Sequence, residues 1–240
     1  MSILFISDLH LSGERENITK LFINFLEQRA SKADALYILG DLFEVWPGDD
    51  MIQPDYEQSI SKMKQLADNG LALYVMQGNR DFLMAEEFAQ VSGATLIEDP
   101  TVINLYGTPT LLMHGDTLCT DDIDYQKFRA MVRDPRWKAD FFSKPNEERL
   151  AMTSKYRKIS KDETAKKAMN IMDVNQKAVE AIMLDKNITQ LIHGHTHRPA
   201  IHDFSFKNKE MKRIVLGDWF EQGSVLECNE AGCQLESLNK

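Results

Sequence analysis

The sequence has no long apolar run and few cysteines, and each of these shortages limits what the chain can be. No stretch of the 240 residues reaches the roughly 20 apolar residues needed to span a bilayer, so any membrane association must be peripheral. The N-terminus enters a predicted strand at Ile3, without the basic and apolar regions of a signal peptide. The three cysteines, Cys119, Cys228 and Cys233, have no metal-ligand spacing. We therefore expect no disulfide framework and a reducing, cytoplasmic environment.

Basic residues are scarce as well. The chain has 28 Lys and Arg against 37 Asp and Glu, a net charge of −9 and a pI of about 5.2. Nucleic acid is not an expected partner, because general binding to it needs a basic face. The hydrophobic content of 43% and charged content of 27% are typical of a globular protein. The length fits one large domain or one domain with an insertion, and nothing points to an obligate protein partner.

The sequence does contain five short polar motifs, each placed directly after an apolar run that predicts a buried strand. The runs are Ile3–Ile6, Ala35–Leu39, Leu71–Met76, Thr110–Met113 and Ile188–Ile192. The motifs that follow them are Asp8-Leu9-His10, Gly40-Asp41, Gly78-Asn79-Arg80-Asp81, His114-Gly115-Asp116 and Gly194-His195-Thr196-His197. Ligands collect at the carboxyl ends of strands in open α/β sheets. We therefore expect the five motifs to converge on one rim of the fold.

The motifs bring together donors that suit a divalent metal ion. Carboxylate, amide and imidazole groups are typical ligands of Mn²⁺, Fe²⁺ or Zn²⁺. A single Asp or His after a strand is more often a helix cap or a satisfied polar group. Seven donors together exceed the needs of one tetrahedral ion and fit two ions that share a bridging carboxylate. These candidate ligands are Asp8, His10, Asp41, Asn79, His114, His195 and His197.

The remaining pattern predicts alternating helices and strands. Apolar residues recur at helical spacing in Asn17–Ala30 and Glu57–Asn69, which predicts two helices with one buried face each. A short helix is expected at Met84–Gln90. The turn residues 106–109 predict a hairpin between Thr101–Leu105 and Thr110–Met113. Short closing strands are expected at 201–206, 212–216, 224–227 and 232–236.

Between the fourth and fifth motifs, Thr120–Lys186 has a different character. This segment shows helical patterns and no convincing strand. It holds 15 of the 28 Lys and Arg against 12 acidic residues, so its net charge is +3 while that of the remainder is −12. It also holds five of the 12 Met and several aromatic residues. We predict a helical insertion over the rim, suited to a substrate with phosphates and acyl chains. A solvated helical excursion is the alternative.

The series D-x-H, G-D, G-N-x-D, H-G-D and G-H-x-H resembles the calcineurin-like metallophosphoesterases. Ile6–Leu11, Gly78–Phe82 and His193–Pro199 are similar to one branch, the UDP-2,3-diacylglucosamine diphosphatases of lipid A synthesis, and the similarity extends over essentially the whole chain. The resemblance implies an α/β fold, an αββα four-layer sandwich with a helical lid. It places the core at 1–119 and 187–240 and the inserted lid at 120–186.

The resemblance also assigns roles to residues. Asp8, His10, Asp41 and His197 would hold one ion, and Asp41, Asn79, His114 and His195 the other, with Asp41 bridging. The expected ions are two Mn²⁺, although other divalent ions would suit the same donors. His193 stands beside the last motif but corresponds to no ligand. The implied catalytic residues are Asp41, Asn79, Arg80 and His195. The implied substrate contacts are Asn79, Arg80, Asp122, Tyr125, Ser160, Thr164, Lys167 and His195.

Arg80 departs from the wider family pattern, in which a histidine follows the motif asparagine. Arginine cannot act as an acid at neutral pH. A pyrophosphate leaving group is a phosphate monoester, with a second pKa of about 6, and it departs without a proton. Arg80 therefore favours cleavage of a phosphoanhydride over a phosphodiester. The alternative is that Arg80 pairs with Asp81 or with another carboxylate.

In the predicted lid, Ser160, Thr164 and Lys167 fall at positions i, i+4 and i+7. On a helix they share one face and present two hydroxyls and a cation. Without the resemblance, the same residues are typical of a solvated helix face.

The function implied is a Mn-dependent hydrolase acting at the cytoplasmic face of the inner membrane. Water would attack the α-phosphorus of UDP-2,3-diacylglucosamine, giving UMP and 2,3-diacylglucosamine 1-phosphate. A soluble nucleotide-sugar pyrophosphatase and a general phosphodiesterase are alternatives with the same metal site. A protein-binding scaffold that kept only the fold is a third. Such scaffolds lose metal ligands, whereas this chain has all seven.

Overall fold

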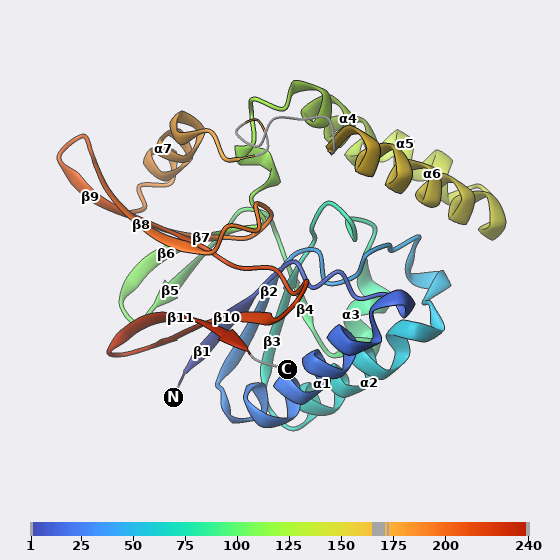
Figure 1. The fold of residues 1–240 in the computed structure, drawn as a ribbon, viewed down its shortest axis with the longest axis horizontal. Helices are drawn as coiled ribbons and strands as arrows, with labels where there is room; N and C mark the ends of the chain where they lie inside the picture. The colour runs from blue at the N-terminus through green and yellow to red at the C-terminus, as the bar shows by residue number, and fades with distance from the viewer. Residues whose placement is uncertain (1, 165–170, 172, 239–240) are drawn as a thin grey trace.

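The computed structural model describes residues 2–164, 171 and 173–238, together with the side chains of all of these except Lys161 and Thr164. Two β-sheets pack face to face, and helices cover the outer face of each (Figure 1). Three apolar clusters fill the spaces between these layers. The predicted αββα four-layer sandwich is confirmed.

The first sheet has six strands in the order β11-β10-β1-β2-β3-β4. Its four N-terminal strands run parallel, and β10 pairs antiparallel with β1. The first three parallel strands are short apolar runs that are largely buried on both faces, as expected for a sheet inside a layered fold. The strands are β1 (Ile3–Ile6), β2 (Ala35–Leu39), β3 (Ala72–Met76), β4 (Thr95–Ile97), β10 (Gly223–Asn229) and β11 (Gly232–Leu238).

Helices α1 (Glu16–Gln28), α2 (Pro54–Asp68) and α3 (Glu86–Ser92) cover the outer face of this sheet. Their apolar residues recur every three or four positions, so each helix turns one stripe toward the sheet. In α1 the buried stripe includes Ile18 and Phe22, which join the same cluster as Leu4 of β1. This packing fixes the carboxyl ends of β1–β3, where the first three motifs begin.

The second sheet has five strands in the order β5-β6-β7-β9-β8. Strands β6, β7 and β9 are parallel, and β5 and β8 flank them antiparallel. Helix α7 (Gln176–Asp185) packs on the outer face through Val179 and Met183. The strands are β5 (Thr101–Leu105), β6 (Thr108–Met113), β7 (Gln190–His193), β8 (Ala200–Phe206) and β9 (Lys209–Val215).

Three further helices lie over the end of the sandwich that carries the motifs (Figure 1). They are α4 (Ile123–Arg133), α5 (Pro135–Phe142) and α6 (Asn146–Thr164), and we call them the lid helices. Asp122 caps α4 by accepting a hydrogen bond from the Tyr125 amide, and Asp134 caps α5 in the same way. The described residues of the predicted insertion contain helices and turns only. Its boundaries stay a prediction, because α7 lies inside the predicted range yet packs on the sheet.

Most of the predicted elements are confirmed, with shifts of a few residues at their ends. Strand β4 was not predicted, because three residues are too few for a periodic pattern. The predicted turn at 106–109 is shorter than expected. Only Tyr106 and Gly107 form it, with φ of 48° and 89°, and Thr108 and Pro109 already belong to β6.

The expectation that no disulfide forms is wrong in this structure. Cys228 and Cys233 face each other across the β10–β11 hairpin and are joined in a disulfide. Their spacing in the sequence did not reveal this, because the pairing follows from the register of the hairpin. Cys119 is buried and is not in a disulfide. None of the described helices is both long and apolar enough to cross a membrane.

Candidate metal centre

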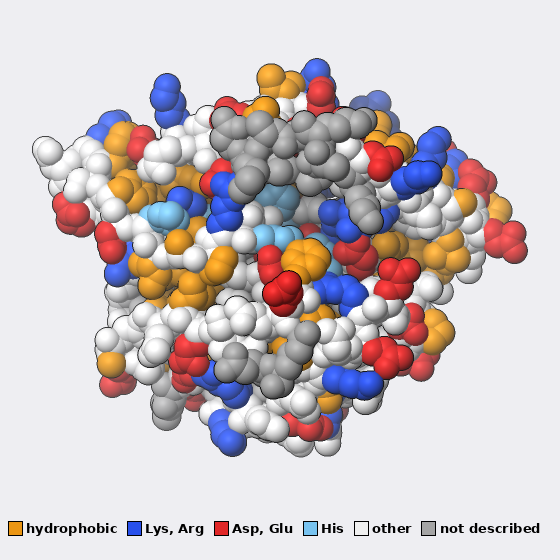
Figure 2. All heavy atoms as spheres, in the orientation of Figure 1, with side chains coloured by type: hydrophobic (Ala, Val, Ile, Leu, Met, Phe, Trp, Pro, Cys, Tyr) orange, Lys and Arg blue, Asp and Glu red, His pale blue; other side chains and the backbone are white. Residues whose placement is uncertain are grey.

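The five motifs lie together where the two sheets meet. Each follows its predicted strand: β1, β2 and β3 in the first sheet, and β6 and β7 in the second. The rim therefore belongs to two sheets, which the sequence pattern alone did not separate. The His195 amide joins them by donating to the Asp8 carboxylate at 2.8 Å, across 187 residues of chain. In the space-filling view, histidine side chains reach the surface near the middle of the face (Figure 2).

The backbone at this rim is strained. Five candidate ligands lie in the left-handed region, with φ between 50° and 70°: Asp8, His10, Asp41, His195 and His197. Residues other than glycine rarely adopt this conformation, and strain of this kind clusters at functional sites. The four other described cases, Tyr106, Asn187, Lys207 and Asn208, lie away from the motifs. The strain turns consecutive side chains inward from very short loops.

Two glycines make room for the acidic ligands. A Cβ atom on Gly78 would stand 2.1 Å from Asp41 Oδ1, and one on Gly194 would stand 2.4 Å from Asp8 Oδ2. No side chain fits at either position without moving the carboxylate. The glycine of the third motif therefore serves the close approach of a carboxylate from the neighbouring strand, and that of the fifth motif the approach of a carboxylate from the other sheet.

One half of the site brings together Asp8, His10, Asp41 and His197. The Nε2 atom of His197 lies 3.3 Å from Asp8 Oδ1, and Nε2 of His10 lies 3.7 Å from Asp41 Oδ2. Asp8, His10 and His197 each offer a ligand atom within 4.8 Å of the others. The structure thus assembles the four residues predicted for the first ion.

The other half is built around Asp41 and His114. The Nε2 atom of His114 lies 3.8 Å from Asp41 Oδ1 and 2.9 Å from Asn79 Oδ1. Asp8, Asp41 and His114 form the second described group with mutually close ligand atoms. His195 is not in that group, but its ring lies 5.0 Å from the ring of His114. Asp41 stands between His10 and His114, as a bridging ligand must.

Three of the imidazoles are oriented from behind. The Nδ1 atom of His114 lies 2.9 Å from the Leu39 carbonyl, that of His10 lies 2.9 Å from Glu44 and that of His197 lies 3.3 Å from Asp218. A partner on Nδ1 leaves Nε2 free to face the site, which is the usual arrangement of histidine ligands.

The buried carboxylates and histidines of the site shift one another's pKa values. Burial opposes ionisation of the His114 ring, but Asp41, Asp116 and Asp8 outweigh it and raise the pKa of His114 to about 9. Burial, together with the charge on His114, lowers the pKa of His195 to about 4. Although burial alone would raise it, nearby histidines hold the pKa of Asp8 well below its usual range. The Asp8 carboxylate therefore remains charged and attracts cations.

The donor set fits a divalent ion. Asp8 Oδ1 and His10 Nε2 are fully enclosed and have no hydrogen-bond partner among the described atoms. Buried polar atoms normally have partners, and a metal ion satisfies both kinds of atom at once. A donor set that mixes imidazole with carboxylate and amide oxygens suits a transition-metal ion better than Ca²⁺ or Mg²⁺, which prefer oxygen ligands alone.

The lid helices are tied to the rim beside this site. Asp116 is fully buried, and its Oδ2 accepts from Tyr125 Oη and Arg129 Nε, each at 2.6 Å. Arg133 donates to the Gly78 carbonyl at 2.9 Å. The Tyr125 ring stacks at 6.0 Å on that of His195. The predicted contact residue Tyr125 therefore lies beside a predicted ligand.

Arg80 and Ser160 also meet. The Arg80 amide donates to Asp41 Oδ1 at 2.8 Å, and its guanidinium lies 3.5 Å from Ser160 Oγ on α6. Asp81 is not its partner, because the Asp81 carboxylate accepts from the Gly78, Leu42 and Phe43 amides. Among the described residues, no carboxylate lies within ion-pairing distance of Arg80.

Two of the predicted substrate contacts fall outside what the structure describes. These are Lys167 and the side chain of Thr164. Asp122 is described, and it lies at the start of α4 as the cap.

Sequence reasoning missed three acidic residues of the site: Glu44, Asp116 and Asp218. Asp116 stood inside the fourth motif but was assigned no role. Asp218 had a clear signal, since Leu216-Gly217-Asp218 at the end of β9 repeats the Leu39-Gly40-Asp41 pattern at the end of β2. Glu44 had no such signal, because no sequence motif distinguishes an acidic residue three positions after a ligand.

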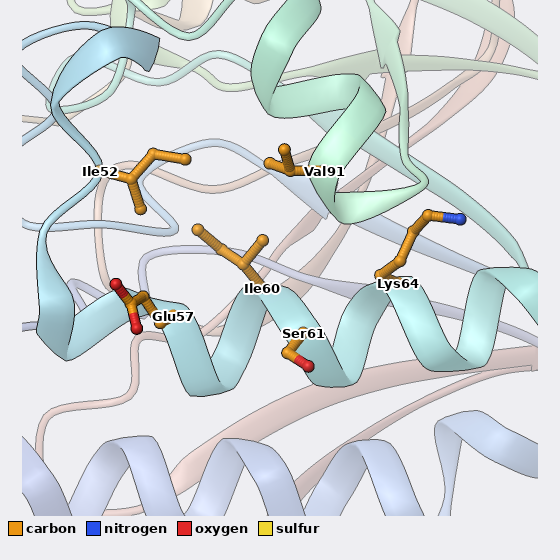
Figure 3. A pocket seen from close by; sticks show the side chains of 6 residues that line it. All are labelled: Ile52, Glu57, Ile60, Ser61, Lys64 and Val91. Carbon is orange, nitrogen blue, oxygen red and sulfur yellow. The ribbon is translucent and has the colours of Figure 1, made fainter.

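The surface also has a pocket away from the candidate metal centre. A surface pocket of about 360 Å³ opens between α2 and α3 and mixes apolar side chains with Glu57 and Lys64 (Figure 3). None of the predicted site residues lines it. Its lining residues are Ile52, Glu57, Ile60, Ser61, Lys64 and Val91.

The chain is similar to several known proteins. The family model of the calcineurin-like phosphoesterases matches residues 1–199. A UDP-2,3-diacylglucosamine hydrolase of Stenotrophomonas maltophilia is 47% identical over the whole of both chains. A protein of the same name from Chromohalobacter salexigens is 50% identical, over 91% of this chain and 89% of its own. Among solved structures, an archaeal phosphodiesterase aligns with 99% of this chain and all of its own, at 12% identity and a TM-score of 0.49.

Proposed function

The chain belongs to the calcineurin-like phosphoesterase family, and from that premise we propose that it is a UDP-2,3-diacylglucosamine hydrolase of lipid A biosynthesis. Relatives carrying that name match it at nearly half of all positions over their full lengths. The observation that carries the proposal is the convergence of Asp8, His10, Asp41, His114 and His197 at one buried rim. A scaffold that had kept only the fold would not need these strained loops.

We propose that the site holds two Mn²⁺ ions. Asp8, His10, Asp41 and His197 would hold one, and Asp41, Asn79, His114 and His195 the other. Ions held there would supply Lewis acidity and would bring the pKa of a water toward neutral pH. The position of Asp41 between His10 and His114, at 3.7 and 3.8 Å, supports its role as the bridge.

The protein's own groups bind and orient the pyrophosphate. Arg80 presents a permanent charge that forms no ion pair with a described carboxylate, and its Nε has no described hydrogen-bond partner, so its guanidinium is available to phosphate oxygens. Asn79 and His195 lie at the same edge and would contact the phosphate as well. Attack of water on the α-phosphorus breaks the bond to the bridging oxygen. UMP and 2,3-diacylglucosamine 1-phosphate leave without an acid catalyst.

We assign recognition of the acylated sugar to the lid, residues 120–186. Asp122, Tyr125, Ser160, Thr164 and Lys167 are its proposed substrate contacts. Tyr125 and Ser160 lie beside His195 and Arg80, which supports the assignment. Partly exposed aromatic side chains on the lid helices add an apolar surface suited to acyl chains: Phe128, Trp137 and Tyr156.

The substrate is a lipid, and we propose peripheral attachment at the cytoplasmic face of the inner membrane. Half of the large exposed apolar residues in the described chain lie on the lid helices, among basic side chains: Ile123, Met131, Phe142, Leu150 and Ile159. Such a surface binds anionic bilayers reversibly. Sedimentation with anionic vesicles should fall as salt rises, and binding unaffected by salt would contradict an electrostatic contribution.

The test of the proposed function is hydrolysis of the lipid nucleotide in ¹⁸O-water, followed by mass analysis. The label should appear in UMP and not in the sugar phosphate. Label confined to the sugar phosphate would place the attack at the other phosphorus. UDP-N-acetylglucosamine is the control substrate, and equal turnover of both would favour a soluble nucleotide-sugar pyrophosphatase.

A further inference from the structure

Glu44 occupies a position between the metal centre and the lid helices. It lies after β2, three residues past Asp41, and its amide donates to the Leu11 carbonyl at 3.0 Å. That hydrogen bond holds its backbone against the loop that carries His10. The Glu44 side chain is only 21% exposed. Its location is therefore set by the rim and not by the lid.

The two carboxylate oxygens of Glu44 point to two different partners. Oε2 lies 2.9 Å from Nδ1 of the predicted ligand His10. Oε1 accepts a hydrogen bond from Nε of Arg157, in the middle of α6. Burial opposes its charge, but the bond to His10 and the charges of Arg80 and Arg157 prevail and lower the pKa of Glu44 to about 2. One carboxylate thus joins a ligand imidazole to a lid helix.

We propose that Glu44 is a positioning residue that couples occupation of the metal site to the seating of α6. This inference rests on the proposed metal site, because His10 must be a ligand for the coupling to exist. An ion on Nε2 would fix the His10 ring, so Nδ1 would stay beside Glu44 Oε2. The carboxylate then stays where Arg157 can reach it. Linkage is reciprocal, so a seated α6 must tighten the metal site by the same factor.

Asp218 provides the matched comparison. It stands behind His197 as Glu44 stands behind His10, at 3.3 Å from Nδ1. Its other described hydrogen bond is to the nearby Phe220 amide. Both carboxylates orient ligands of the same proposed ion, but only Glu44 also pairs with a lid helix among the described residues.

The experiment measures two quantities on the full-length protein after removal of metal by chelation. Calorimetric titration gives the dissociation constant for Mn²⁺. Hydrogen–deuterium exchange of peptides from α6, with and without saturating Mn²⁺, gives the seating of the helix. The variants are Glu44→Gln, Arg157→Met, the two combined, and Asp218→Asn. Lys158→Met is the control, since it removes an exposed charge from the same helix.

In the wild type, Mn²⁺ should slow exchange in α6. Arg157→Met should weaken Mn²⁺ binding by about fivefold or more and abolish the response of α6. Glu44→Gln should weaken binding about 10- to 100-fold and abolish the response as well. The double variant should be no weaker than Glu44→Gln alone. Asp218→Asn should weaken binding but leave α6 responsive, and Lys158→Met should change neither quantity.

Two results would overturn the inference while leaving the proposed function intact. One is wild-type Mn²⁺ affinity in Arg157→Met. The other is an α6 that still responds to Mn²⁺ in Glu44→Gln. If the wild-type protein takes up no Mn²⁺ at all, the proposed metal site itself is wrong, and the coupling falls with it.

Discussion

The rim and the lid helices are held in place by different kinds of contact. At the rim, carboxylates accept backbone amides at short range, such as the Arg80 amide on Asp41 at 2.8 Å. The lid helices attach through long arginine side chains that reach acceptors on the core. Four arginines do this: Arg129 on Asp116, Arg133 on Gly78, Arg149 on Asp50 and Arg157 on Glu44.

These two kinds of contact allow different amounts of movement at the rim and in the lid helices. A backbone amide on a strand end has little freedom, so a ligand fixed by it keeps its position within a fraction of an ångström. An arginine side chain has several rotatable bonds and holds a helix near the core without fixing it rigidly. The rim is therefore suited to metal ions and reacting atoms. The lid helices are suited to the lipid substrate that we propose, which must enter the site and leave again.

The largest effect should follow from removing the shared carboxylate at the rim. Asp41→Ala should lower kcat/KM by at least about 100- to 1,000-fold on both the lipid nucleotide and bis(p-nitrophenyl) phosphate, because both need the metal site. Circular dichroism should show an unchanged fold. Retention of either activity would mean that Asp41 does not bridge.

A smaller and selective effect should follow from loosening the lid. Arg129→Met removes a charge-assisted hydrogen bond to Asp116, worth roughly 1.5–3 kcal/mol, and should lower kcat/KM on the lipid nucleotide about 10- to 100-fold. Turnover of bis(p-nitrophenyl) phosphate should change little. Lys127→Met, which removes an exposed charge from the same helix, is the control. Equal losses of kcat/KM on both substrates would mean that the lid helices do not act selectively on the lipid nucleotide.

The rim should also be intolerant of a single methyl group. Gly78→Ala places a Cβ atom against Asp41 and should lower the free energy of unfolding by up to about 3 kcal/mol in urea denaturation. Gly70→Ala is the matched control: its φ of 102° carries strain, but nothing lies within 4 Å. Gly78 itself has no positive φ, so its loss should come from crowding alone. A loss at Gly78 no larger than that at Gly70 would mean that Asp41 moves aside at little cost.

The smallest effect should be the pH-dependent contribution of Asp99 to stability. Burial, with the charge on Asp116, raises the pKa of Asp99 to about 6. A raised carboxyl pKa means that ionised Asp99 costs stability, so the cost grows as pH rises from about 4 through 6. Asp99→Asn should therefore stabilise the protein by about 1 to 2 kcal/mol at pH 8 and hardly at all at pH 4. Urea denaturation at both pH values measures this, with exposed Asp124→Asn as the control.

The rim and the lid helices also differ in how much of each could be predicted from the sequence. The ligands were predictable because each stands directly after an apolar strand, and parallel strands end at the same edge. His10 and Asp41 needed no long-range information beyond that rule. The lid contacts depended on the resemblance, since Ser160 on a helix looks like any solvated serine. Its proximity to Arg80 became visible only in three dimensions.

What the sequence could not supply was pairing across long separations. Glu44 and Arg157 stand 113 positions apart, and neither carries a local signal of the other. The same holds for the register that brings Cys228 to Cys233. Asp218 was the exception, because its Gly-Asp pattern was readable and was overlooked.

The hydrogen bond from the His195 amide to Asp8 closes a loop of nearly the whole chain. Ions held at this rim would act as a cross-link between the two sheets, since each sheet contributes ligands. A cross-link that closes a long loop removes much of the freedom of the unfolded chain. Metal supply should therefore govern how long the protein survives heat and proteases, and not only whether it turns over substrate. Cells short of the ion would lose the enzyme itself, and with it the capacity to recover quickly once the ion returns.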